Sequence, residues 1–120
     1  MRRILIVDDE PDVLKALKSS LERQRDFKVS VASDGEEALK ILETETPDLV
    51  VLDLVMPNMG GEQLLNYIRR DSRTATTPVI ISTVRRETSS LVGLMNAGAT
   101  DYLMKPYDVR ELLSVINTYI

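Results

Sequence analysis

The sequence predicts an α/β fold of the (βα)5 type, in which a doubly wound, five-stranded parallel sheet has the strand order 2-1-3-4-5. Two observations predict it. Short, unbroken apolar runs alternate five times with longer stretches in which apolar residues recur at helical spacing. The segments between the runs leave no room for antiparallel hairpins, so right-handed crossovers are expected. At 120 residues the chain has the length of one domain, and we expect residues 1–120 to form a single unit.

The predicted strands are the apolar runs at residues 4–7, 27–31, 49–52, 79–81 and 102–104. Those at 4–7, 49–52 and 79–81 are continuously apolar, which is typical of strands covered on both faces of a parallel sheet. The run at 27–31 instead alternates apolar and polar residues, which indicates an edge strand. An edge position for the second strand favours the flavodoxin-like order 2-1-3-4-5.

Five helices are predicted from apolar residues that recur three and four positions apart. Their apolar positions are Val13, Leu14, Leu17 and Leu21; Ala38, Ile41 and Leu42; Leu64, Leu65 and Ile68; Leu91, Val92, Leu94 and Met95; and Leu112, Leu113, Val115, Ile116 and Tyr119. Pro11 suits a first helical turn, and Asp34 with Glu37 and Asp108 with Glu111 are typical capping boxes. These signals place the helix starts to within a few residues.

Two further features lie near predicted helix ends. Gly98 is typical of a left-handed helix stop. Arg69, Arg70 and Arg73 are interpreted as a solvated helix end. The last predicted helix runs to Ile120 without a capping residue, so we leave open whether an output domain follows.

Composition excludes several classes of function. The chain has no His and no Cys, so zinc sites, thiol nucleophiles, disulfides and His general bases are excluded. The formal net charge of −4 argues against direct nucleic-acid binding. No apolar run is long enough to span a bilayer, and residues 1–4 do not begin a signal peptide. We therefore expect a cytoplasmic protein with no membrane partner.

Polar side chains follow the predicted strands at their carboxyl ends. In chain order these residues are Asp8, Asp9, Asp53, Ser82, Thr83 and Lys105. Singly, they are explained as helix caps, turn formers or loop residues. However, the carboxyl ends of parallel strands lie on one edge of a sheet, where open α/β folds bind ligands. Their coincidence at that edge predicts one shared pocket.

The chemistry of this pocket follows from its charges, because clustered carboxylates repel one another unless a cation lies near. A divalent ion and Lys105 would balance the three carboxylates, and an all-oxygen donor set favours Mg²⁺. We interpret the pocket as a magnesium-dependent phosphoryl site in which Asp8 and Asp9 hold the metal. Asp53, on a central strand, is the predicted nucleophile that forms an aspartyl phosphate. Lys105 and the Thr83 hydroxyl would contact phosphate oxygens.

Four stretches, in this order and spacing, resemble the receiver domain of the two-component response regulator family over essentially the whole chain. They are VDDE at 7–10, DLVMPNM at 53–59, PVIIST at 78–83 and GATDYLMKP at 98–106. The resemblance implies that Asp53 accepts a phosphoryl group from a phosphohistidine on a histidine kinase or phosphotransfer protein. That partner would supply the histidine that this chain lacks. The resemblance also implies that Asp8, Asp9, Asp53 and the main-chain carbonyl of Val55 bind Mg²⁺.

The resemblance further implies a switch. Asp53, Thr83 and Lys105 match the family's catalytic residues, Thr83 and Tyr102 match its switch residues, and Lys105–Pro106 matches its usual cis peptide. Such a domain catalyses its own phosphorylation from a phosphodonor and its own dephosphorylation, without being a conventional enzyme. Phosphorylation would shift the face made by the fourth helix, fifth strand and fifth helix, with Arg86 on it. That face would control an output domain or downstream protein, or a phosphorylation-dependent homodimer.

Two residues depart from the family pattern. Val84 follows Thr83 where the family usually has Ala or Gly, and we expect it to slow dephosphorylation by narrowing access to the phosphoryl group. Gly60 stands before Gly61 where the family more often has Asp or Asn, which makes the loop more pliable and leaves open how the next helix is capped.

Three other interpretations remain open. A flavin or nucleotide carrier would need a Ser/Thr/Gly-rich loop or Gly-rich phosphate motif, whereas residues 8–10 are acidic. A haloacid-dehalogenase-like phosphatase typically has two Asp spaced by one residue, whereas Asp8 and Asp9 are adjacent. A degenerate receiver that acts only as an interaction module would share every motif, and labelling by a phosphodonor would separate it from an active one.

Overall fold

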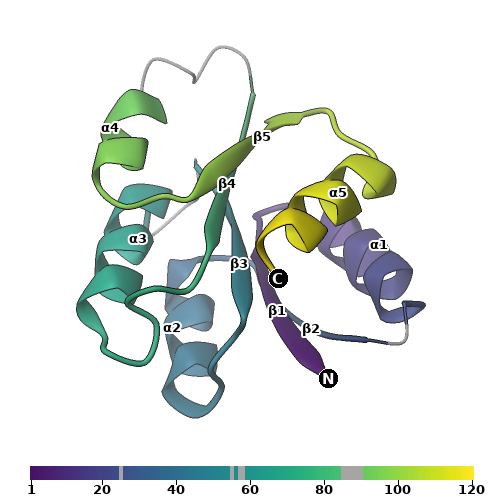
Figure 1. The fold of residues 1–120 in the computed structure, drawn as a ribbon, viewed down its shortest axis with the longest axis horizontal. Helices are drawn as coiled ribbons and strands as arrows, with labels where there is room; N and C mark the ends of the chain where they lie inside the picture. The colour runs from purple at the N-terminus through teal and green to yellow at the C-terminus, as the bar shows by residue number, and fades with distance from the viewer. Residues whose placement is uncertain (25, 55, 57–58, 85–90) are drawn as a thin grey trace.

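The computed structural model describes residues 1–24, 26–54, 56, 59–84 and 91–120. Within these residues, strands and helices alternate along the chain (Figure 1). The elements are β1 (Arg2–Val7), α1 (Pro11–Glu22), β2 (Phe27–Ala32), α2 (Gly35–Thr44), β3 (Leu49–Asp53), α3 (Gly61–Arg70), β4 (Val79–Val84), α4 (Leu91–Asn96), β5 (Asp101–Lys105) and α5 (Val109–Tyr119). The strands form one parallel sheet in the order β2-β1-β3-β4-β5. The predicted fold class and strand order are confirmed.

The sheet lies between two helical layers, with α1 and α5 on one face and α2, α3 and α4 on the other (Figure 1). Alternation along the strands assigns each side chain to one layer. In β1, Ile4 and Ile6 pack with the α1 and α5 side chains, whereas Leu5 and Val7 pack with those of α2, α3 and α4. The central strands are thus buried on both faces, as their continuous apolar runs predict.

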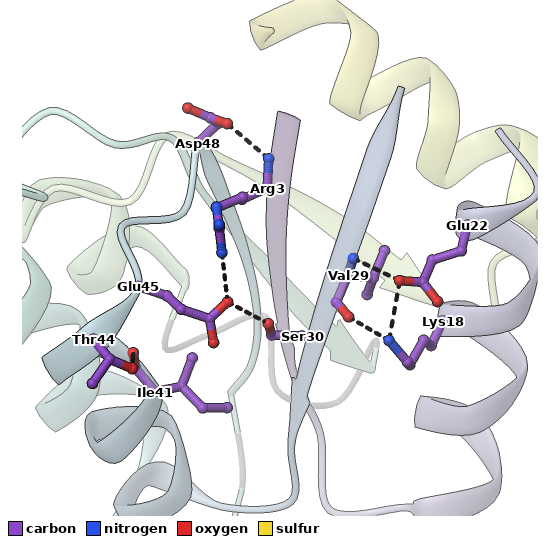
Figure 2. A network of polar contacts seen from close by, with 9 residues as sticks. All are labelled: Arg3, Lys18, Glu22, Val29, Ser30, Ile41, Thr44, Glu45 and Asp48. Carbon is purple, nitrogen blue, oxygen red and sulfur yellow. Dashed lines mark hydrogen bonds and ion pairs between the residues drawn. The ribbon is translucent and has the colours of Figure 1, made fainter. Parts of the chain in front are cut away.

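The edge strand β2 is tied to the helices beside it by side chains that bind its backbone (Figure 2). From α1, Lys18 Nζ donates to the Val29 carbonyl at 2.6 Å, and Glu22 Oε2 accepts from the Val29 N–H at 3.1 Å. Beyond the end of α2, Glu45 accepts from the Ser30 hydroxyl at 2.9 Å. The predicted edge position is confirmed, and the Lys18 and Glu22 contacts occupy backbone groups of Val29 that an edge strand otherwise leaves unpaired.

The predicted helix ends are also present. Asp34 accepts from the Glu37 N–H at 2.8 Å, and Asp108 accepts from the Glu111 N–H at 2.9 Å. Pro11 is the first residue of α1. Gly98, after α4, has φ of 114°, a conformation that L side chains rarely adopt.

The interpretation of the arginines as a solvated helix end is wrong for Arg69. Its guanidinium donates to the carbonyls of Gly98 at 2.9 Å, Thr77 at 2.7 Å and Thr74 at 3.2 Å. Burial lowers its pKa from the ordinary value of Arg. Arg69 therefore joins α3 to the connections that precede β4 and β5. None of the helices in the described ranges is long and apolar enough to cross a membrane.

Candidate functional site

The strand register brings polar side chains from neighbouring strands into one row. Val7 in β1 pairs with Leu52 in β3, so Asp8 lies beside Asp53. Asp53 in turn pairs with Ser82 in β4. The strands β3 and β4 extend further than their apolar runs predict, so Asp53 and Ser82 belong to the sheet itself rather than to loops.

Alternation along each strand shows which side of the sheet these residues face. Val51, Ile80 and Leu103 pack in the core beneath α1 and α5. Residues two positions later on the same strands, which are Asp53, Ser82 and Lys105, therefore face that same layer.

Lys105 links the two buried carboxylates of the row. Its Nζ donates to Asp8 Oδ2 at 2.9 Å and to Asp53 Oδ2 at 3.4 Å. Asp8 is 2% exposed and Asp53 7% exposed, so both ion pairs are shielded from water. Burial opposes the charge on Lys105, but the Asp8 hydrogen bond and the Asp53 charge outweigh it and raise the pKa of Lys105. The lysine is therefore held protonated between two acceptors.

Three consecutive acids form a cluster that could hold a metal ion. Carboxylate oxygens of Asp8, Asp9 and Glu10 lie within 4.8 Å of one another; Asp8 is buried and the other two are exposed. Asp8 Oδ1 accepts from the Glu10 N–H at 2.9 Å, which fixes the buried acid against the chain. An all-oxygen donor set of this charge fits a hard divalent cation. Glu10 was not predicted as a ligand, although three adjacent acids could have indicated it.

The other predicted site residues are placed differently. Thr83 is buried, but its hydroxyl donates to the Val84 carbonyl at 3.2 Å, and alternation puts its side chain opposite that of Asp53. Tyr102 is 46% exposed on β5. Val55 and Arg86 lie outside the described residues. The structure thus brings Asp8, Asp53 and Lys105 into contact but leaves the Thr83 hydroxyl bound to its own strand.

A cavity of about 390 Å³ adjoins this site between the start of α1 and the chain that follows β5. It is bordered by Glu10, Leu17, Lys105 and Tyr107. The Lys105–Pro106 peptide is cis, as the resemblance implies. Burial raises the pKa of the Tyr107 phenol, whose surroundings include Ser82 and both buried carboxylates. Tyr107 was not among the predicted site residues.

Comparison with known proteins decides the family. Residues 4–117 match the model of the response regulator receiver domain. The chain belongs to the response regulator receiver domain family. The predicted family is confirmed, and with it a place in two-component signal transduction.

This receiver domain has relatives of two lengths. All of it matches the response regulator ArlR of Staphylococcus saprophyticus with 36% identity over 120 residues, covering 53% of that protein. All of it also matches protein PilH of Pseudomonas aeruginosa with 38% identity over 120 residues, covering 98% of that protein. The chain therefore spans about half the length of ArlR and nearly all of PilH.

Solved structures agree with the assignment. The chemotaxis protein CheY4 of Vibrio cholerae superposes on this receiver domain with a TM-score of 0.93. The two chains are 27% identical, and the match covers 100% of this chain and 99% of that one. Receiver domains of response regulators typically pair with histidine kinases and output domains.

Proposed function

We propose that this receiver domain is a phosphorylation-dependent switch in which Asp53 takes a phosphoryl group from a phosphohistidine on a histidine kinase or phosphotransfer protein. The observation that carries the proposal is the buried contact of Lys105 Nζ with Asp8 and Asp53. A lysine held charged beside the acceptor carboxylate is a point-charge partner for phosphate oxygens. Phosphoryl transfer depends mainly on positioning and charge compensation, so the lack of His in this chain is no obstacle.

The transfer exchanges one bond to phosphorus for another. An Asp53 carboxylate oxygen attacks phosphorus and forms the acyl phosphate as the donor's P–N bond breaks, and the imidazole leaves with a proton. Asp8, Asp9, Asp53 and the Val55 carbonyl would hold Mg²⁺, and Glu10 extends this acidic set. When bound, Mg²⁺ would compensate the negative charge of the phosphoryl oxygens.

The chain's own residues then respond to the new group. Lys105 turns from the carboxylates to one phosphoryl oxygen. The Thr83 hydroxyl leaves the Val84 carbonyl and donates to a second phosphoryl oxygen. Tyr102, which is exposed here, turns inward into the space that Thr83 leaves. Hydrolysis of the acyl phosphate in the same pocket resets the switch.

The output surface of this proposal is made of α4, β5 and α5. Figure 1 shows β5 between these two helices. Val92 and Met95 on α4 and Tyr102 on β5 are large apolar side chains exposed on these elements. We propose that phosphorylation changes this surface and so controls an output domain, a downstream protein or a homodimer.

Intact mass measurement after incubation with a small phosphodonor tests the function. We expect a gain of one phosphoryl group in the native protein with Mg²⁺, and none without the metal or in Asp53→Asn. An unlabelled native protein would instead support the degenerate receiver, which acts as an interaction module. Amide shifts on α4, β5 and α5 that stay unchanged on phosphorylation would refute the proposed output surface.

A further inference from the structure

Ser82 carries a buried hydroxyl beside the acceptor strand β3. Its side chain is 2% exposed, and within the described residues its Oγ is a buried polar atom with no hydrogen bond. Burying a hydroxyl without a hydrogen bond costs free energy, and such an atom in a native fold calls for an explanation. The position matters because Ser82 stands beside Asp53 in the sheet and faces the same layer.

Tyr107 is the second hydroxyl on that side of the sheet. Its ring packs against the core beneath α1 and α5 and borders the cavity beside Lys105. Its phenol lies near Ser82, whose side chain opposes the rise in the pKa of the phenol that burial causes. Within the described residues Ser82 Oγ has no hydrogen bond, so the two hydroxyls lie near each other without forming one. The adjacent cavity gives the Tyr107 ring room to move toward Ser82.

The ion pairs of Lys105 explain why this approach matters. Its partners are the carboxylates of Asp8 and Asp53, which are also proposed to hold a cation and accept the phosphoryl group. Once the two carboxylates hold the cation and the phosphoryl group, Lys105 turns from them to a phosphoryl oxygen. How its ammonium is aimed at that oxygen then depends on the chain that follows, where Tyr107 is the next side chain packed into the core.

We propose that Ser82 and Tyr107 form a hydroxyl pair that positions Lys105 once the pocket is loaded. The Tyr107 O–H donates to Ser82 Oγ and ties the chain after β5 to β4. This inference rests on the proposed function, which supplies the loaded state. Both are positioning residues, since they act through Lys105 and touch neither the donor nor the reacting oxygen.

Ser82→Ala, Tyr107→Phe and the double variant test the pair, with Tyr67→Phe as the matched control. Tyr67 is 39% exposed on α3, so loss of its hydroxyl should leave the labelling rate unchanged. Each single variant should lower the maximal rate of labelling by a small phosphodonor about three- to tenfold. The phosphodonor concentration that gives half the maximal rate should not change. The double variant should be no slower than the slower single variant, because the two hydroxyls act as one unit.

A second readout needs no phosphodonor. With Mg²⁺ alone, amide hydrogen exchange at Tyr107 and Asp108 should be faster in both single variants than in the native protein and in Tyr67→Phe. Rate effects that multiply in the double variant, or exchange that stays at the native rate, would overturn the pair. If the native protein takes no phosphoryl group, the proposed function fails, while the exchange measurement still tests Ser82 and Tyr107.

Discussion

The Arg69 side chain connects segments of the chain that lie far apart in the sequence. Its guanidinium binds three main-chain carbonyls in two connections and lies 3.4 Å from the Thr100 hydroxyl. Arg69→Gln leaves part-buried acceptors without their charged donor, so we expect it to lower the free energy of unfolding by about 2 kcal/mol. Urea denaturation measures this directly. Arg70→Gln is the control, since Arg70 is exposed and should change stability by less than about 0.5 kcal/mol.

The same pair shows where sequence-based prediction ends. Arg69 and Arg70 are adjacent and chemically identical, and only their directions on α3 differ. A step of about 100° around the helix aims one at Gly98 and the other at solvent. The sequence carries no signal of this difference, because the acceptors of Arg69 are backbone carbonyls from distant connections.

Val84 controls access to the phosphoryl group in the proposed switch. It borders the cavity next to Lys105, and its carbonyl accepts the Thr83 hydroxyl. Val84→Ala removes two methyl groups at this approach, so water should reach the acyl phosphate more easily. We expect the variant to dephosphorylate several-fold faster, followed as loss of the phosphorylated mass after removal of the phosphodonor. Equal lifetimes for the two phosphorylated forms would contradict this role.

At the scale of elements, the start of α3 distinguishes two adjacent glycines. A Cβ on Gly61 would lie 2.7 Å from the main-chain oxygen of Asp53, whereas a Cβ on Gly60 would meet nothing within 4 Å. Gly61→Ala should therefore destabilise the domain by about 1–3 kcal/mol and displace the acceptor strand. Gly60→Asp should instead stabilise it by a few tenths of a kcal/mol, because Gly60 is an N-cap without a side-chain acceptor. Thermal unfolding of both variants checks the opposite signs.

The contact between α1 and the edge strand makes part of the stability depend on pH. The Val29 N–H bond and then Lys18 hold the pKa of Glu22 below its ordinary value. The folded form thus favours the carboxylate, and this contribution is present above the pKa of the unfolded chain and lost as the pH falls through the folded pKa. Glu22→Gln should cost at most about 1 kcal/mol at pH 7, since the pair is partly exposed.

Urea denaturation across pH 3 to 7 separates the contribution of Glu22 to stability from the general loss of stability at acidic pH. The difference between the native protein and Glu22→Gln should shrink to nothing at the acidic end. Glu43→Gln is a matched control on α2, an exposed acid whose removal should change stability little at any pH. A difference between native protein and Glu22→Gln that is constant with pH would assign the loss to packing rather than to the charge.

At the scale of the whole molecule, the alternation of strands and helices made the fold predictable, and parallel strand ends made the position of the site predictable. Asp8, Asp53 and Lys105 come together because the register aligns four neighbouring strands, β1, β3, β4 and β5. The hydroxyl geometry was not predictable in the same way. Ser82 and Thr83 are adjacent residues of β4, so their side chains point to opposite faces of the sheet. Which of the two faces Asp53 cannot be read from the apolar pattern, because the strand is polar at this end.

The acidic cluster should couple metal binding to the stability of the whole domain. Asp8, Asp9 and Glu10 carry like charges whose oxygens lie within 4.8 Å, so the folded chain holds repulsion that a divalent cation relieves. Because a cation at this site binds only the folded form, Mg²⁺ at 100 times its Kd should raise the free energy of unfolding by about 2.7 kcal/mol. Asp9→Asn should raise the metal-free Tm and lose most of the response to Mg²⁺. Asp12→Asn, with the acid in the first turn of α1 rather than in the cluster, should keep the native response. If Mg²⁺ raises the Tm of the native protein and of Asp9→Asn equally, Asp9 is not a ligand of the cation.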